Sequence, residues 1–237
     1  MTDLWRGRLE SMPIEPPVDP GGRVVVISAH PDDEVLAVGG WLSEQTHREV
    51  VFVTATDGEG PAWRGAGMHW ADTRTLDLHD VVARAVGGPG EYVGRPGFWA
   101  GAIGIAACWL GGAHGVARTL EDRAPRLDAH GLAHLGAVRA SLDVAGLALE
   151  AAAARLDGGA ADTDELERLA LSLRAHVADV VESTISHVGR ALGPAPLAFD
   201  ARHAEHVADL QVFVRQHHAE RDLEQLGALE EKGDVDA

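Results

Sequence analysis

The residues best suited to chemistry lie near the start of this 237-residue chain, in the segment Ala29-His30-Pro31-Asp32-Asp33-Glu34. His30, Asp32 and Asp33 place an imidazole and two carboxylates within four positions, a ligand set that suits zinc. Asp33 and Glu34 also suit the first turn of a helix, where the helix dipole favours carboxylates. The segment therefore predicts a metal site, and the plainer alternative is a capped helix start after a strand.

Two β-branched runs flank this segment and predict the elements that position it. Residues 24–28 and 50–54 read as strands buried on both faces, and residues 33–46 between them read as a helix. Such a sequence predicts a right-handed, Rossmann-like βαβ unit with parallel strands over residues 23–60. The motif would then follow the carboxyl end of the first strand, where open α/β sheets bind ligands. The unit is too small to be stable alone.

The rest of the chain predicts helices. One half-exposed strand near 76–78 and a Gly- and Pro-rich linker fill residues 61–97, and Ala- and Leu-rich helical stretches follow at 98–122, 128–156, 163–192 and 200–226. Long helices with short connections favour an antiparallel bundle. We therefore predict a mostly α fold, in which a small N-terminal βαβ unit precedes an antiparallel four-helix bundle at 98–227. A Pro-rich arm (1–22) and an acidic tail (228–237) flank the two.

The composition limits the classes of molecule that the protein is expected to bind. The chain has 20 Lys and Arg against 37 Asp and Glu, a net charge of −17. This charge argues against nucleic acid as a partner, because phosphate binding needs a basic face.

Cys108, the single cysteine, is expected to be a small buried hydrophobe. The uncharged stretch 97–117 has spanning length, but its Gly and Ala content favours a core helix over a membrane span. Residues 1–20 do not predict a signal peptide, so we expect a cytoplasmic protein with a small-molecule substrate.

The front segment resembles a known enzyme family. Residues 25–40, with AHPDDE at their centre and Gly39-Gly40 after it, and Thr56-Asp57-Gly58-Glu59 after the second strand, are similar to the opening of the PIG-L/LmbE zinc-dependent N-deacetylases. The resemblance implies that His30 and Asp33 bind zinc and that Asp32 is the general base. It implies hydrolysis of an N-acetyl group, on an N-acetylated sugar or a similar small molecule.

That family takes a third ligand from a downstream His-x-x-His. In His203-Ala204-Glu205-His206, the resemblance would make His206 the ligand and His203 the stabiliser of the tetrahedral intermediate. The alternative is that both are ordinary histidines of a bundle helix. Because contacts with the other helices would place that helix, we predict that His206 lies beyond ligand distance from His30 and Asp33, leaving a weak, open zinc site.

The rear of the chain resembles the C-terminal helical domain of acyl-CoA dehydrogenase-like flavoproteins from about residue 67. The resemblance rests on 71–81, Pro96-Gly97-Phe98-Trp99, the small-residue segment 106–113 and the closing segment 214–223. It implies FAD as a possible cofactor and a homo-oligomer formed through the helices. The other domains of that family and its glutamate base have no counterpart among these residues.

Four residues near the end of the chain could serve that flavoprotein interpretation. The family places catalytic histidines near His217 and His218, and Arg215 and Arg221 could meet a flavin pyrophosphate. The alternatives are solvated helix histidines and surface ion pairs with Glu220 or Asp222.

Zinc-dependent deacetylation is the leading hypothesis. A helical module that binds or oligomerises is its rival, and an inactive fusion of two enzyme pieces is the third.

Overall fold

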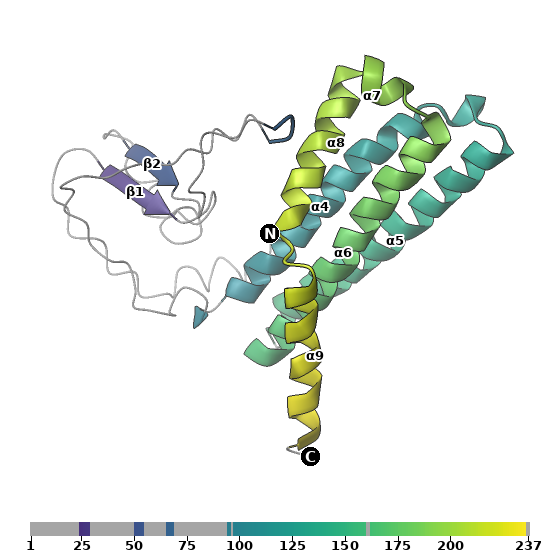
Figure 1. Cartoon of the computed structure of the whole chain (residues 1–237). Helices are drawn as coiled ribbons and strands as arrows, with labels where there is room; N and C mark the ends of the chain where they lie inside the picture. The colour runs from purple at the N-terminus through teal and green to yellow at the C-terminus, as the bar shows by residue number, and fades with distance from the viewer. Residues whose placement is uncertain are drawn as a thin grey trace. The chain divides into compact units, whose positions relative to one another are not determined.

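The chain is described by a computed structural model that covers residues 24–28, 50–54, 65–68, 94–95, 97–159 and 162–235, with the backbone alone at 24–28, 50–54 and 230–235. This described part is mostly α-helical (Figure 1). The chain divides into two units, one of residues 1–65 and 69–84 and the other of residues 66–68 and 85–237. The mostly α class predicted from the sequence is therefore confirmed for these residues.

The first unit contains two short strands. Strand β1 (Val24–Ser28) pairs in parallel with β2 (Val50–Thr54), in a register that runs from Val24 opposite Val50 to Ser28 opposite Thr54. Both strands consist almost entirely of β-branched and aromatic residues, which suit a pleated, buried surface. The helix predicted at 33–46 and the strand near 76–78 lie outside the described residues.

The second unit is a helical bundle. Its helices are α4 (Phe98–Glu121), α5 (Ala129–Gly158), α6 (Thr163–Leu192), α7 (Ala195–Phe199), α8 (Ala201–Phe213) and α9 (Glu220–Val235). The long helices α4, α5 and α6 run alternately up and down and pack along their lengths, and α8 lies against α4 (Figure 1). The first three predicted helical stretches match α4, α5 and α6 closely.

The fourth predicted stretch is wrong in one respect, because it is not one helix. After α8, a 3-10 turn (Val214–Gln216) interrupts the helix. Ala219, which has a left-handed φ of 48°, follows this turn, and α9 then begins. Helix α9 then continues to Val235, so it extends into the stretch that was expected to be an acidic tail.

Aspartates fix where three of the helices begin. The carboxylates of Asp128, Asp162 and Asp200 each accept a hydrogen bond from the backbone N–H three residues later, over 2.8, 2.8 and 3.1 Å. A side-chain oxygen at this position satisfies one of the four N–H groups that a helix start leaves unbonded. The sequence thus sets the register of α5, α6 and α8 locally.

Helix α4 supplies the centre of the core. Trp109, Val116 and Leu120 of α4 are completely buried among Val138 of α5 and Val177 of α6. By length and composition alone, residues 98–126 and 129–158 could each cross a membrane, a test that core helices of soluble proteins also pass. Helix α4 has a completely buried face, so it is a core helix of the described bundle, as expected from its sequence.

Cys108 corrects an expectation, because it is exposed rather than buried. Its neighbours Ala106, Trp109 and Leu110 take the core side of α4, which leaves Cys108 on the opposite side beside Gly104 and Gly111. The apolar surroundings in sequence suggested burial, but the helical period decides which face a residue occupies.

Candidate functional site

The predicted metal-binding residues His30, Asp32 and Asp33 lie outside the described residues. The strands that precede the two motifs are described, and they are parallel with Ser28 opposite Thr54. Both strands therefore end at the same edge of the pair. His30 follows two residues after one strand end, and Thr56 two residues after the other.

His203 and His206, the candidates for a third ligand, lie on α8. His203 is buried, with its Nδ1 2.9 Å from the hydroxyl of Thr119 on α4. Burial lowers the pKa of His203, and the nearby Asp200 carboxylate only partly opposes this. His203 is therefore a core histidine held by α4.

His206 also faces α4. Its Nδ1 lies 3.6 Å from the point where a Cβ on Gly115 would stand, and one turn further along Leu210 fills the space beside Gly112. These contacts place α8 on α4, as expected for a bundle helix. The distance from His206 to His30 stays a prediction, since His30 lies outside the described residues. Within those residues, no three His, Cys, Asp or Glu side chains form a group that could hold a metal ion.

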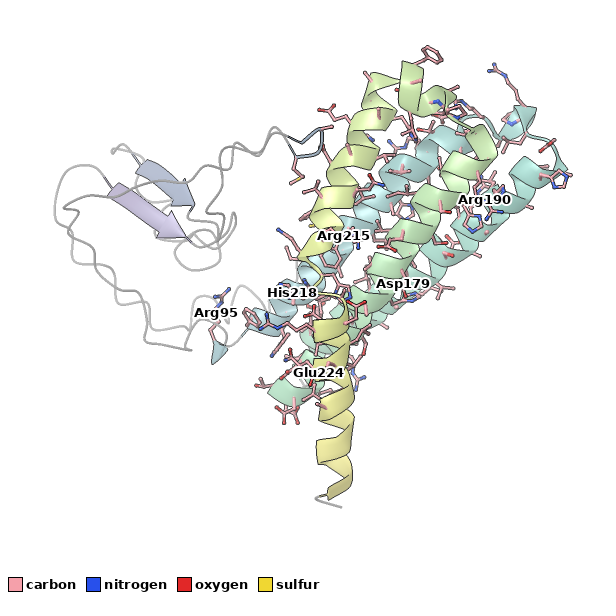
Figure 2. The ribbon with its side chains drawn as sticks, viewed as in Figure 1. Arg95, Asp179, Arg190, Arg215, His218 and Glu224 are labelled. Carbon is pink, nitrogen blue, oxygen red and sulfur yellow. The ribbon has the colours of Figure 1, made fainter. Side chains whose placement is uncertain are left out.

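A group of polar side chains surrounds Asp222 between the end of α8 and the first turn of α9, and Figure 2 labels one of its members, His218. We call the five residues Asp222, His217, His218, Arg174 and Trp109 the Asp222 cluster. Nδ1 of His217 donates to Oδ2 of Asp222 and Nδ1 of His218 donates to Oδ1, each over 3.1 Å, and the backbone N–H of His218 donates over 3.3 Å. The carboxylate thus fixes both imidazole rings.

Asp222 is only 7% exposed, so the charge of its carboxylate depends on these partners. Burial alone would raise the pKa of Asp222. The hydrogen bonds from the backbone and side chain of His218 and from His217 outweigh burial and lower that pKa below its ordinary value. Asp222 is therefore ionised at neutral pH, and each Nδ1 that faces it carries a proton.

Arg174 ties this cluster to α6. Its guanidinium lies 4.7 Å from the ring centre of Trp109, its Nε lies 3.9 Å from Oδ2 of Asp222, and its Nη2 donates to the carbonyl of Gln216 over 2.8 Å. Burial lowers the pKa of Arg174, and the attraction of Asp222 partly opposes this. Among the described residues, the buried indole N–H of Trp109 has no hydrogen-bond partner. The cluster joins α4, α6 and the start of α9.

These contacts change the interpretation of the late histidines. His217 is not a solvated helix residue, because its side chain is only 9% exposed, its ring lies beside that of Trp109, and the residue precedes α9. His218 does remain exposed, with its side chain 62% accessible. The His218-to-Asp222 spacing of four residues was the available sequence signal. Arg174 is more than 40 residues away in the sequence, and no local pattern marks it.

The two arginines considered for a flavin pyrophosphate do not fit that role here. Arg215 forms an exposed ion pair with Glu182 of α6, rather than with Glu220 or Asp222 as expected for a surface pair. Arg221 is exposed on the first turn of α9, next to Glu220 and Asp222. A pyrophosphate would have to displace Glu182 and approach these acids, so we derive no step that uses FAD.

The Asp222 cluster could transfer a proton at one atom, Nε2 of His218. A carboxylate that holds Nδ1–H of an imidazole leaves Nε2 as the basic nitrogen, as in acid–base dyads. In His218 that nitrogen belongs to an exposed ring, whereas His217 is enclosed. No hydrogen bond in the described part links His218 to a Ser, Thr or Cys, so the cluster gives no nucleophile to activate.

One more histidine pair joins two helices. Nδ1 of His134 on α5 lies 2.8 Å from Nδ1 of His187 on α6, so one ring must donate and the other must accept. Burial, then the neighbouring His134 and Arg190, lower the pKa of His187. The pair holds α5 to α6 only while at least one facing nitrogen is unprotonated.

Comparisons with protein-family models, curated proteins and solved structures find no match to this chain. The resemblances to PIG-L/LmbE deacetylases and to acyl-CoA dehydrogenase-like flavoproteins therefore rest on the sequence motifs alone.

Proposed function

We propose that the front unit hydrolyses an N-acetyl group in a zinc-dependent reaction. The parallel pairing of β1 and β2 supports this proposal, because Ser28 and Thr54 are paired at the carboxyl ends of the two strands, and the AHPDDE segment and the segment 56–59 follow these residues in the sequence. Ligands bind outside the carboxyl ends of parallel strands. The proposal includes a βαβ unit with its helix at 33–46.

The residues that follow β1 in the sequence have the donor chemistry for the reaction. His30 and Asp33 would hold zinc, and their imidazole and carboxylate suit that ion. Bound zinc lowers the pKa of a water and polarises a carbonyl. Asp32 would take the proton as the water oxygen attacks the acetyl carbon. The C–N bond then breaks, the amine leaves with a proton, and acetate is released.

Acetate release from an N-acetylated amino sugar, measured with added zinc, tests the proposal. Asp32→Asn should abolish release yet keep zinc, and His30→Ala should abolish both. His176→Ala is the control, because His176 is exposed on α6 outside the motif. Full activity in Asp32→Asn would refute the role given to the motif.

A second candidate function belongs to the helical unit, which we propose self-associates. The specific observation is the outer face of α5, where Leu132, Val144 and Leu147 are 50%, 57% and 65% exposed. The resemblance to flavoprotein helical domains also favours a homo-oligomer. Light scattering at several concentrations tests this candidate, and a strict monomer would refute it. We place both activities in the cytoplasm.

A further inference from the structure

We propose that α5 pairs with α5 of a second copy of this chain, in antiparallel orientation, about a two-fold axis that lies between the two helices at the level of Asp143 and Val144. This inference rests on the proposed self-association of the helical unit. It adds the surface, the direction and the register of the pairing.

The starting observation is that α5 is apolar but poorly covered. In the most apolar 18-residue segment of α5, 22% is buried inside the chain, whereas the corresponding segment of the helical stretch 98–126, which contains α4, is 39% buried. The outer face of α6, by contrast, exposes polar side chains such as Asp179 and Glu182, and Figure 2 shows Asp179 on that helix. The polar outer face of α6 is compatible with exposure to solvent, whereas the apolar outer face of α5 is compatible with an apolar partner.

Seven exposed small or apolar residues of α5 form one line along the helix, and the exposed Leu132 and Ala153 lie off this line. They recur every three or four positions, which places them on the same side. All of them are exposed: Ala133, Gly136, Ala140, Val144, Leu147, Ala151 and Ala154. Small residues dominate this line, so another helix can approach closely while Val144 and Leu147 fill the gaps.

The line is symmetric about the middle of the helix. Helix α5 runs from Ala129 to Gly158, so its midpoint falls between Asp143 and Val144. Three pairs lie at equal distances on either side of that point: Ala133 with Ala154, Gly136 with Ala151, and Ala140 with Leu147. A two-fold axis at the midpoint sets each residue opposite its pair mate in the other copy, which is the self-complementarity that such an interface requires.

The charges along the same face favour this register. Arg139, Asp143 and Glu150 follow one edge of the apolar line, at spacings of four and seven residues. In the proposed pairing Arg139 lies opposite position 148 of the second copy, about 3 Å along the axis from its Glu150. The two-fold axis produces this Arg–Glu contact twice. Each Arg139 also stands one turn from Asp143 of its own helix and offsets the meeting of the two Asp143 side chains.

Arg139 is available for this contact. Its partner within the chain is Glu121 of α4, at 3.8 Å, and both side chains are more than one third exposed. Such long, exposed pairs contribute little to stability, so Arg139 can change partners. The same charges argue against a bilayer as the occupant, because Asp143 lies at the middle of α5, Glu150 lies two turns further along, and charged groups are costly in hydrocarbon.

Cross-linking of the full chain tests the register, in a Cys108→Ser background. Ala133→Cys combined with Ala154→Cys should give a disulfide-linked dimer under mild oxidation, whereas Ala133→Cys alone should not. Spin labels at position 133 should lie about 32 Å apart along the axis in the dimer, since 21 residues of helix separate the pair mates. A parallel pairing would instead bring the two labels at position 133 together, which would overturn the proposal.

Substitutions separate this inference from the proposed function. Leu147→Glu should weaken the dimer at least tenfold, and Leu223→Glu on α9, at a side chain that is also half exposed, should not. Arg139→Glu should weaken it as well, and adding Glu150→Arg should restore it. Circular dichroism confirms that each variant folds. A wild-type monomer at every concentration would overturn both self-association and the α5 pairing. A dimer that Leu147→Glu leaves intact would overturn the pairing alone, as would cross-links between α5 and the front unit in a monomer.

Discussion

The two units of this chain carry opposite kinds of information. The front unit has two strands of five residues and a short motif whose residue types predict a metal site. The helical unit has helices of up to 30 residues and a large buried core, but its polar groups mainly hold helices together. A short motif can therefore predict a reaction without predicting how the chain folds around it, whereas apolar periodicity predicts packing without predicting a reaction.

Removing the largest core side chain would sharpen this contrast most. Trp109→Ala should lower the free energy of unfolding of the bundle by about 3–5 kcal/mol, because it leaves a cavity beneath Arg174 and Phe213. Denaturant unfolding followed by circular dichroism measures this loss, and zinc binding by the front unit should not change. The control is Cys108→Ala at the exposed neighbouring position. Equal stability of the two variants would show that the core is not centred on α4.

The Asp222 cluster offers a smaller effect. Asp222→Ala removes the acceptor for three hydrogen bonds and leaves the guanidinium of Arg174 without its carboxylate, so we expect a loss of about 2–3 kcal/mol in unfolding free energy. Glu182→Ala, which breaks the exposed pair with Arg215, should cost less than about 1 kcal/mol. A reversed order of the two losses, measured by the same unfolding experiment, would remove the structural role of the cluster.

Mild acid should have the smallest effect, and it should act on the helical unit. The pKa values of His187 and His203 both lie below 6.5 in the folded chain, so the unfolded chain binds protons first as the pH falls. Their contribution to stability is complete above about pH 6.5 and decreases as the pH falls toward the folded pKa values. Unfolding free energies at several pH values from neutral to mildly acidic measure the slope.

His187→Gln should flatten that slope, whereas His176→Gln, at an exposed position of α6, should leave it unchanged. The same slope in both variants would show that the contact between His134 and His187 is not sensitive to protonation.

The sequence predicted the helices well, because their signals are local. Asp128, Asp162 and Asp200 mark the helix starts, and the apolar periodicity marks their core faces. The sequence predictions were wrong where a structural feature depends on contacts between residues far apart in the chain, or on which side of a helix a residue faces. The break before α9 depends on Ala219 and on the hydrogen bonds to Asp222, in a stretch that favours helix throughout.

The candidate site shows the same limit. His217 and His218 were identified from the sequence, but Arg174 and Trp109 reach them only through the packing of α4 and α6. Cys108 was assigned to the core because its neighbours are apolar, although its phase on α4 faces it outward. The metal motif stays a prediction, since His30, Asp32 and Asp33 lie outside the described residues.

The most direct test of the central claim, that the front motif binds zinc without help from the bundle, is elemental analysis of the full chain after equilibrium dialysis against enough zinc to fill a weak site, with the zinc of the outer buffer subtracted. We predict bound zinc in the wild-type chain, the same amount in His206→Ala and in His134→Ala, and none above background in His30→Ala. Absence of zinc from the wild-type chain, or retention of zinc by His30→Ala, would contradict the account.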